Sequence, residues 1–302
     1  MTNHINIVEV GPRDGLQNEK QTIDVATKVE LIEQLADAGL KSVEAGAFVS
    51  PKWVPQMAAS DDVLGTIKRK QGVSYPVLTP NIKGYEGARA GKADTIAIFG
   101  AASESFSKKN INATIEESLE RFKPVVEAAK ADGVRVRGYV SCVLGCPYEG
   151  KIPLDNIVRV SKALYDMGAY EISLGDTIGV GTPGEARAMI RAVAGEVPIK
   201  ALAGHFHDTY GQALANIYAS LEEGVRTFDS SVSGLGGCPY APGASGNVAT
   251  EDVVYMLHGS GFETGADLDA LVRTSVWISE KLGRHPASKV TRAKTAATIQ
   301  KM

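Results

Sequence analysis

Short apolar, β-prone runs alternate with helical patterns along most of the 302 residues. The predicted strands are Ile5–Val10, Ser42–Ala47, Ser74–Leu78, Thr95–Phe99, Val134–Ser141, Tyr170–Leu174, Ile199–His205 and Arg226–Val232. Helical patterns between them include Ala26–Ala38, Ile115–Ala131, Asn156–Met167, Gly184–Ala194 and Gln212–Glu223. Repeated alternation of this kind indicates an α/β protein with a parallel sheet. Eight such units in about 260 residues match a closed (β/α)8, or TIM, barrel.

The alternative is a doubly wound open sheet. We rank it lower because the first strand is not followed by a Gly-x-Gly-x-x-Gly fingerprint. Beyond the eighth strand, further helical patterns cover Glu251–His258 and Asp267–Leu282, which predicts extra C-terminal helices. With no Pro/Gly/Ser-rich linker and no charge block, we expect residues 1–302 to form a single domain.

Composition restricts the classes of partner and the compartment. A net charge of −3 gives no reason to expect nucleic acid or an anionic membrane surface as a partner. No run approaches the roughly 18 apolar residues of a membrane span, and the N-terminus shows no signal or transit pattern. The three cysteines cannot all pair with one another, and the spacing of Cys142 and Cys146 is not that of a zinc knuckle. We therefore expect a cytoplasmic protein.

In barrels of this type the chemistry takes place at the C-terminal ends of the strands. Most of the unusual polar side chains of this chain follow, or end, a predicted strand. They are Arg13, Asp14, Glu44, Lys108, Lys109, Asn110, Asp176, His205, His207, Cys238 and Asn247. Scattered residues rarely fall on one face in this way, so we treat them as candidate site residues.

His205 and His207 end the seventh predicted strand, and residues two apart point to the same side of a strand. Two imidazoles on one side form half of a metal site, although one could cap a turn while the other is a satisfied core residue. Asp14 and Asn247 are candidate oxygen ligands because strands one, seven and eight adjoin in a closed barrel. This mixed set suits Mg²⁺ or Mn²⁺ better than zinc. Alternatively, Asp14 caps the turn before Gly15, and Asn247 caps a helix.

Three further charged residues have two interpretations each. The guanidinium of Arg13 offers a planar fork to carbonyl or carboxylate oxygens, or else forms a surface salt bridge. Glu44 is flanked by apolar residues and needs a partner, so it either holds Arg13 or supports a metal-bound water. Asp176 orients a histidine or the substrate, or it caps the loop to Thr177.

Cys238 lies in a loop in which five of the fourteen residues from 234 to 247 are glycine. Such a loop can move and can bring its backbone close to a ligand. A free cysteine is more often a small hydrophobic residue than a reactive one. On the catalytic face of a barrel, however, an exposed thiol is a candidate acid/base or nucleophile.

Six stretches distributed along the chain resemble one known family. They are Gly11-Pro-Arg-Asp-Gly-Leu-Gln-Asn-Glu-Lys20, Phe48-Val-Ser-Pro-Lys-Trp-Val-Pro-Gln-Met57, Phe106-Ser-Lys-Lys-Asn-Ile-Asn112, Gly138-Tyr-Val-Ser-Cys142, Ser173-Leu-Gly-Asp-Thr-Ile-Gly-Val-Gly-Thr-Pro183 and Ser231-Val-Ser-Gly-Leu-Gly-Gly-Cys-Pro-Tyr240. The family is that of the 3-hydroxy-3-methylglutaryl-CoA lyases, within the metal-dependent barrel lyases and Claisen-type synthases. The last stretch resembles the active-site cysteine signature of the lyases.

This resemblance implies cleavage of 3-hydroxy-3-methylglutaryl-CoA to acetyl-CoA and acetoacetate by a retro-Claisen reaction. It implies that the metal ligands are Asp14, His205, His207 and Asn247 and that Arg13 stabilises the enolate oxygen. Cys238 would protonate the acetyl-CoA carbanion, with Glu44 and Asp176 in supporting or proton-handling roles. We expect Lys108, Lys109 and Asn110 to contact CoA, unless the lysines are simply solvated. The resemblance also implies a homodimer.

The chain departs from the family pattern in three places. Ala47 stands where serine is frequent, which puts a hydrogen bond near Glu44 in doubt, and Ser233 replaces an alanine, which we expect to be tolerated. The tail lacks the C-terminal cysteine of animal forms, so we expect no thiol switch between subunits. The alternatives are a related lyase for another hydroxyacyl-CoA, a Claisen-type synthase, and a non-catalytic, metal-stabilised barrel that binds a partner.

Overall fold

The computed structural model describes residues 3–237 and 245–299, and its strands form one parallel sheet. The strands are β1 (Asn6–Glu9), β2 (Ser42–Val43), β3 (Gly46–Ala47), β4 (Val77–Leu78), β5 (Thr95–Ala101), β6 (Arg135–Ser141), β7 (Glu171–Asp176), β8 (Leu202–Phe206) and β9 (Thr227–Ser230). Their order is β2-β1-β9-β8-β7-β6-β5-β4-β3, and every pairing is parallel.

The two edge strands of this order, β2 and β3, belong to one short stretch, residues 42–47, so the sheet closes on itself. Within that stretch, Glu44 N donates to Glu9 O on one side at 2.8 Å. The next amide, Ala45 N, donates to Pro76 O on the other side, also at 2.8 Å. Residues 42–47 therefore act as the single second strand that the sequence predicts, and the predicted (β/α)8 barrel is confirmed.

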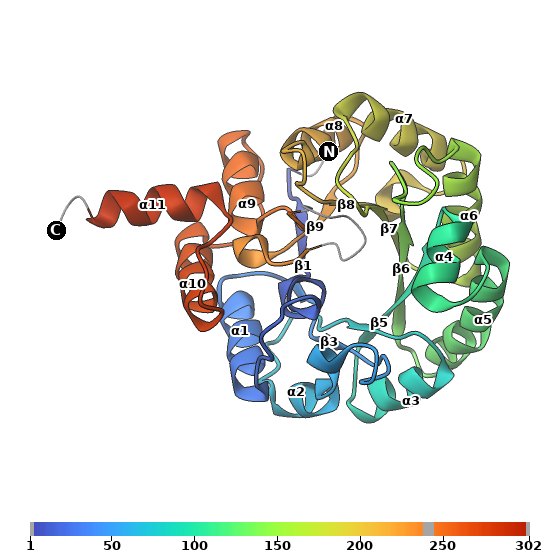
Figure 1. Ribbon diagram of the computed structural model, residues 1–302, viewed down its shortest axis with the longest axis horizontal. Coiled ribbons are helices and arrows are strands. Elements are labelled where there is room, and N and C mark those ends of the chain that lie inside the picture. Colours follow the sequence, from blue (N-terminus) through green and yellow to red (C-terminus); the bar gives the residue numbers. More distant parts are fainter. Residues whose placement is uncertain (1–2, 238–244, 300–302) are drawn as a thin grey trace.

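Helices surround the strands, as the view down the barrel shows (Figure 1). They are α1 (Val25–Asp37), α2 (Ser60–Thr66), α3 (Ile82–Ala90), α4 (Glu104–Ile111), α5 (Ile115–Ala131), α6 (Leu154–Met167), α7 (Pro183–Ala194) and α8 (Ala213–Glu222). Each buries one apolar stripe; on α6 this stripe is Ile157, Val160 and Leu164, spaced three and four residues apart. Side-chain caps fix some of the helix starts: on α5, Thr114 and Glu117 form a capping box.

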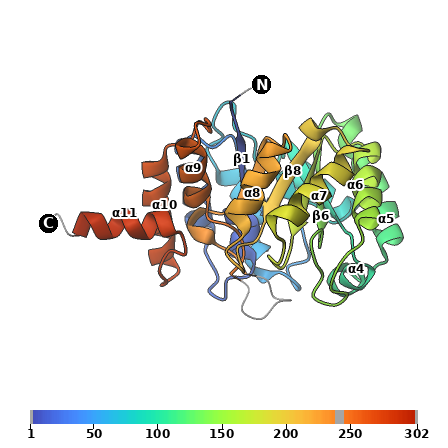
Figure 2. The same ribbon diagram turned by 90° about the horizontal axis from the view of Figure 1, so that it is seen from above.

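The predicted C-terminal helices are also present. They are α9 (Thr250–Gly259), α10 (Leu268–Lys281) and α11 (Lys289–Ile299), and they lie together on one side of the barrel, with α11 extending away from it (Figures 1 and 2). The carboxylate of Asp252 on α9 accepts hydrogen bonds from Ser288 Oγ and Val290 N, both at 2.8 Å, which fixes the start of α11. Within the described residues, no helix is long and apolar enough to cross a membrane.

Two local predictions were wrong. Ile199–Ala201, predicted as the start of a strand, forms a 3-10 turn before β8. No helix was predicted between the fourth strand and Ile115, but α4 lies there. Ser103 Oγ accepts a hydrogen bond from Phe106 N at 3.1 Å and caps the helix, and the Phe106 ring is buried beneath it. Figure 2 shows α4 at the end of the barrel opposite the N-terminus, where the strands have their C-terminal ends.

Candidate active site and metal centre

The segment that follows β1 is a single π-helical turn, Gly11–Gly15, which carries Arg13 and Asp14. The buried carboxylate of Glu9 accepts hydrogen bonds from Gly11 N at 2.8 Å and Val232 N at 2.9 Å. A Cβ at Gly11 would lie 2.6 Å from Glu9 Oε1, so only glycine allows this approach. Glu9 thus joins the turn after β1 to the turn after β9 and fixes the direction in which Arg13 and Asp14 leave the barrel.

Asp14, His205 and His207 converge at the C-terminal end of the barrel. Each offers one ligand atom, and these atoms all lie within 4.8 Å of one another. The two imidazole rings, from the end of β8, have centroids 5.3 Å apart, so the prediction that they share one side is confirmed. The fourth predicted ligand is adjacent, because Asn247 Nδ2 donates to Asp14 Oδ2 at 2.8 Å. Helix α9 begins at Thr250 with Ala249 as its N-cap, so the alternative that Asn247 caps this helix is wrong.

The donor set fits a divalent cation. His205 Nδ1 lies 3.1 Å from Asp229 Oδ2, which leaves Nε2 to face Asp14 and His207. His207 lies beside the backbone of Thr177, yet its buried Nδ1 has no hydrogen-bond partner among the described residues. Two imidazoles and a carboxylate whose ligand atoms converge, with the Asn247 amide beside them, form the environment expected around Mg²⁺ or Mn²⁺.

The charge states of two predicted ligands, His207 and Asp14, support the same conclusion. Burial would lower the pKa of the third, His205, but Asp229 outweighs burial and raises it. Burial, together with His205, lowers the pKa of His207 to about 4, so its imidazole is neutral near pH 7. Burial alone would raise the pKa of Asp14, but the charge of Arg13 outweighs it and the pKa falls to about 2. A metal requires deprotonated ligands, and both groups are deprotonated at neutral pH.

Arg13 is buried and lies between two carboxylates. Its Nε is 2.8 Å from Glu44 Oε2, and its Nη1 is 2.7 Å from Asp14 Oδ1. The interpretation that Glu44 holds Arg13 is therefore confirmed, and the surface salt bridge is wrong. Both Glu44 oxygens are buried and accept no hydrogen bond of normal geometry from the described residues, as the alanine at position 47 suggested. Burial raises the pKa of Glu44, and Arg13 opposes this shift.

Two further candidates are Asp176 and Cys238. Asp176 accepts hydrogen bonds from Val180 N at 3.2 Å and Gly181 N at 2.9 Å, so it caps the loop after β7. Burial raises the pKa of Asp176, and these backbone amides oppose the shift. Its catalytic role stays a prediction. Cys238 lies outside the described residues.

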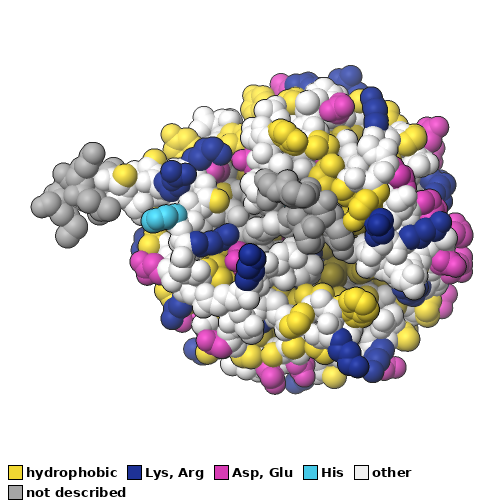
Figure 3. All heavy atoms as spheres, in the orientation of Figure 1, with side chains coloured by type: hydrophobic (Ala, Val, Ile, Leu, Met, Phe, Trp, Pro, Cys, Tyr) yellow, Lys and Arg dark blue, Asp and Glu magenta, His cyan; other side chains and the backbone are white. Residues whose placement is uncertain are grey.

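Lys108, Lys109 and Asn110 lie at the end of α4 and are exposed. Lys109 Nζ lies 4.8 Å from the centre of the Tyr148 ring, which is a cation–π contact. The space-filling view shows basic side chains on this face over α4 (Figure 3). The structure thus places these residues on α4, at the rim of the catalytic end of the barrel.

Asp229 and Arg137 are two buried site residues that the sequence analysis missed. Asp229 lies on β9 beside His205, and Arg137 lies on β6 beside Asp229. Burial would raise the pKa of Asp229, but the charge of Arg137 and the contact with His205 hold this pKa well below its ordinary value. The available signal was a charged residue inside an apolar strand, the same signal that identified Glu44.

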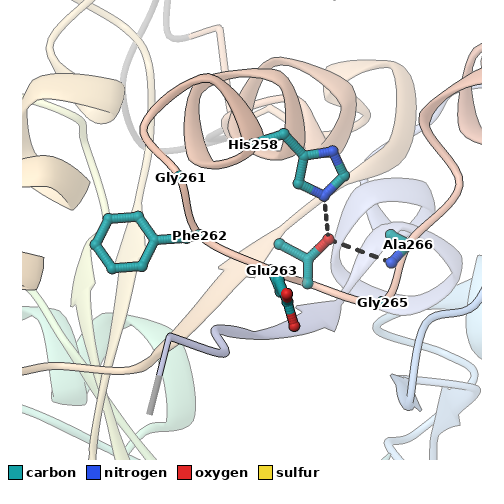
Figure 4. Close-up of a pocket in the computed structure, with 7 residues that line it drawn as sticks. His258, Gly261, Phe262, Glu263, Gly265 and Ala266 are labelled. Atoms are coloured by element: carbon teal, nitrogen blue, oxygen red, sulfur yellow. Dashed lines mark hydrogen bonds between the residues drawn. The ribbon is translucent and has the colours of Figure 1, made fainter. Parts of the chain in front are cut away.

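A pocket of about 490 Å³ lies elsewhere, lined by residues 258 and 261–266 (Figure 4). Thr264 Oγ1 binds His258 Nε2 at 2.9 Å and accepts from Ala266 N at 3.2 Å. The neighbouring backbone of Glu263 pairs with Asn3 and Ile5, which precede β1. This pocket is therefore at the N-terminal end of the barrel, where residues contribute to stability and not to chemistry.

The chain is similar to known proteins over nearly its whole length. The family model described as HMGL-like matches residues 4–278. The chain is 61% identical to a Bos taurus protein named hydroxymethylglutaryl-CoA lyase, mitochondrial, over 96% of this chain and 89% of that one. It is 58% identical to a Pseudomonas aeruginosa protein named 3-hydroxy-3-isohexenylglutaryl-CoA/hydroxy-methylglutaryl-CoA lyase, over 96% of both chains. The crystal structure of hydroxymethylglutaryl-CoA lyase from Pseudomonas aeruginosa superimposes with a TM-score of 0.96 at 57% identity, covering 98% of this chain and 99% of that chain.

Proposed function

The chain belongs to the HMGL-like family, and we propose that it cleaves 3-hydroxy-3-methylglutaryl-CoA to acetyl-CoA and acetoacetate. The observation that carries this proposal is the cluster of Arg13, Asp14, His205 and His207 at the C-terminal end of the barrel. One guanidinium lies next to a set of metal-type ligands there. A carbon–carbon lyase of this class requires that combination.

The reaction sets three requirements. The proton of the tertiary hydroxyl must leave, and the bond between C2 and C3 then breaks to give the ketone of acetoacetate. The bonding electron pair passes to the acetyl-CoA part as an enolate, whose carbon finally takes up a proton. Fixed positive charge at the developing enolate oxygen is usually the largest single contribution to such catalysis. Arg13 supplies this charge, since Glu44 and Asp14 hold its guanidinium in one orientation.

Asp14, His205, His207 and Asn247 would hold the divalent metal, which we take to be Mg²⁺ or Mn²⁺. When bound, such an ion lowers the pKa of the substrate hydroxyl and orients the substrate oxygens. The protein's own contribution is to keep these ligands deprotonated and in place. Asn247 contributes by bonding to Asp14, and Asp229 contributes through His205.

The other candidate residues have supporting roles. Glu44 orients Arg13 and, with its raised pKa, takes part in proton handling next to the reacting hydroxyl. Asp176 shapes the loop after β7 through its backbone hydrogen bonds and is our second candidate for proton handling. Cys238 is the proposed proton donor to the carbanion.

CoA would lie along the rim that carries α4. Lys108 and Lys109 offer positive charge to its phosphates there, and Asn110 offers an amide. Helix α4 lies in the outer ring of the barrel (Figure 1), so we assign these residues to the carrier and not to the reacting group. We also propose that residues 1–302 act as one catalytic domain, as a homodimer. A reducing cytoplasm suits a chain with only three cysteines.

The likeness to the Pseudomonas aeruginosa protein favours a second candidate, in which the same site also cleaves 3-hydroxy-3-isohexenylglutaryl-CoA. The groups that break the bond are unchanged in this alternative. Only the space for the substituent at C3 differs. A Claisen-type synthase remains the alternative among the related barrel enzymes.

A turnover assay on metal-stripped protein distinguishes these candidates. Mn²⁺ or Mg²⁺ is added back with either acyl-CoA, and acetoacetate or its longer analogue is measured. We expect metal-dependent acetoacetate from 3-hydroxy-3-methylglutaryl-CoA. Product from the isohexenyl substrate alone would replace the first candidate by the second. Absence of product from both substrates would reject the lyase function.

A further inference from the structure

We propose that Asp229 is a positioning residue for His205, and that Arg137 and Ser173 hold the Asp229 carboxylate in place for this task. Asp229 lies on β9 and Arg137 on β6, and both side chains are completely buried inside the barrel. The proposal rests on the proposed function only where turnover is measured. Its two main readouts, the protonation site of His205 and the affinity for Mn²⁺, need no substrate.

The Asp229 carboxylate is clamped on both oxygens. Oδ1 lies 2.7 Å from Arg137 Nη2, and Oδ2 lies 3.0 Å from Arg137 Nη1. Ser173 Oγ donates to Oδ2 at 2.8 Å. A bidentate guanidinium fixes both the position and the plane of a carboxylate. Arg137 is itself held from the other side, because its Nε donates to Glu171 Oε1 at 2.8 Å.

This clamp sets the orientation of His205. Asp229 Oδ2 is 3.1 Å from His205 Nδ1, and an ionised carboxylate can only accept a hydrogen bond. The proton of the neutral imidazole is therefore on Nδ1. The lone pair of Nε2 is left facing Asp14 and His207. Rotating the ring by half a turn would place a carbon against Asp229, so the contact also fixes the ring plane.

The two histidines of the cluster differ in this respect. His207 Nδ1 has no hydrogen-bond partner among the described residues, whereas His205 Nδ1 has a carboxylate that is anchored across the barrel. The ring of Tyr139 also packs edge-on against His205, with centroids 6.3 Å apart. A loss of Asp229 should therefore change His205 first and leave the environment of His207 largely as it is.

The first test is nitrogen NMR of metal-stripped protein labelled with ¹⁵N-histidine, at a pH where His205 is neutral. Signals are assigned with His205→Gln and His207→Gln. We expect the proton of His205 on Nδ1 in the wild type. We expect it to move at least partly to Nε2 in Asp229→Asn, because the amide NH2 of the new side chain favours a bare Nδ1. A wild-type His205 that carries its proton on Nε2 would overturn the proposal, and this readout needs no variant at position 229 that folds.

The second test is Mn²⁺ affinity, measured by titration followed by electron paramagnetic resonance. Removing the partner of a ligating histidine typically weakens metal binding by about 10- to 100-fold, and we expect this loss in Asp229→Asn. The matched control is Glu171→Gln, which removes the other carboxylate of Arg137 but leaves the contact between Asp229 and His205 intact. Its Mn²⁺ affinity should stay within about threefold of the wild type.

Two results of this second test would overturn the proposal. One is an unchanged affinity in Asp229→Asn, and the other is an equal loss in Glu171→Gln, which would indicate a merely structural network. Turnover gives a separate check: kcat of Asp229→Asn at limiting Mn²⁺ should fall by the same factor as the affinity and recover as Mn²⁺ is raised. If the wild type shows no lyase turnover while the NMR and Mn²⁺ results are as expected, the proposed function fails and the role of Asp229 stands.

Discussion

The buried carboxylate of Glu9 should make the stability of this protein depend on pH in a predictable direction. Burial raises the pKa of Glu9 from 4.5 to about 7, against the opposing hydrogen bonds from Thr250, Val232 and Gly11. A group whose pKa is higher in the folded state contributes stability that is fully present below the unfolded pKa. That contribution is lost as pH rises from about 4.5 to about 7, and it stays lost above pH 7.

The size of the loss follows from the two pKa values. One pKa unit corresponds to about 1.4 kcal/mol, so ionisation of Glu9 lowers the free energy of unfolding by about 3 kcal/mol in total. Glu9→Gln should lack this loss. The glutamine oxygen can accept from Gly11 and Val232, and its NH2 can donate to Thr250 Oγ1, as a protonated carboxyl would. The Thr250 hydroxyl can then donate to Ser230 Oγ, 2.8 Å away.

The assay is urea unfolding of metal-stripped wild type and Glu9→Gln at pH 5, 6, 7 and 8. The other titrating groups are the same in both proteins, so their contributions cancel when the two free energies of unfolding are subtracted. We expect the stability of the variant, relative to the wild type, to rise by about 2 to 3 kcal/mol across this range. A matched surface variant, Glu86→Gln on α3, should differ from the wild type by no more than about 0.5 kcal/mol at every pH. The reasoning would be refuted if the free energy of unfolding of Glu9→Gln, relative to the wild type, stayed constant or fell between pH 5 and 8. Glu9 would then be ionised in the folded protein over the whole range.

Three further predictions concern turnover. Arg13→Lys should lower kcat about 10²- to 10³-fold at saturating Mn²⁺, because a lysine cannot contact both Glu44 and Asp14 while it faces the enolate. A kcat within threefold of the wild type would argue against this role for Arg13. Lys108→Ala and Lys109→Ala should each raise KM about two- to fivefold with kcat unchanged, because an exposed cation stabilises the bound substrate and the transition state equally. An unchanged KM in the double variant would show that CoA binds elsewhere. Cys238→Ser should lower kcat about 10²- to 10⁴-fold and shift the melting temperature by less than about 2 °C, and a large thermal shift would indicate a packing role.

The barrel could be predicted from the sequence because its pattern is local. Each strand and each helix has its own apolar period, and eight of these units leave few alternatives. The errors also have local causes. Helix α4 was missed because its run is mostly polar, and it depends on the capping hydroxyl of Ser103 and on one buried ring, Phe106.

The candidate site was predictable only in part, for a physical reason. His205 and His207 could be predicted to share a site because residues two apart in a strand point to the same side. Asp14 could be added because the first strand is a neighbour of the strands that follow in a closed barrel. The choice between the two roles of Glu44 needed the position of Arg13, which lies 31 positions earlier in the chain. Asp229 and Arg137 were missed because they act on each other across 92 positions. Charged residues in apolar strands are the only sequence signal of such a pair, and that signal does not identify the partner.

Charge across the barrel interior explains why this cluster should bind a cation in preference to a neutral molecule. Arg13 is shared by Asp14 and Glu44, and Arg137 is shared by Asp229 and Glu171. Two guanidiniums therefore face four carboxylates, and His207 adds no positive charge because it is neutral near pH 7. Uncompensated buried charge is costly, and a divalent cation beside Asp14 would balance it. Without the cation, the raised pKa of Glu44 relieves part of the excess, so metal binding and the orientation of Arg13 are energetically linked.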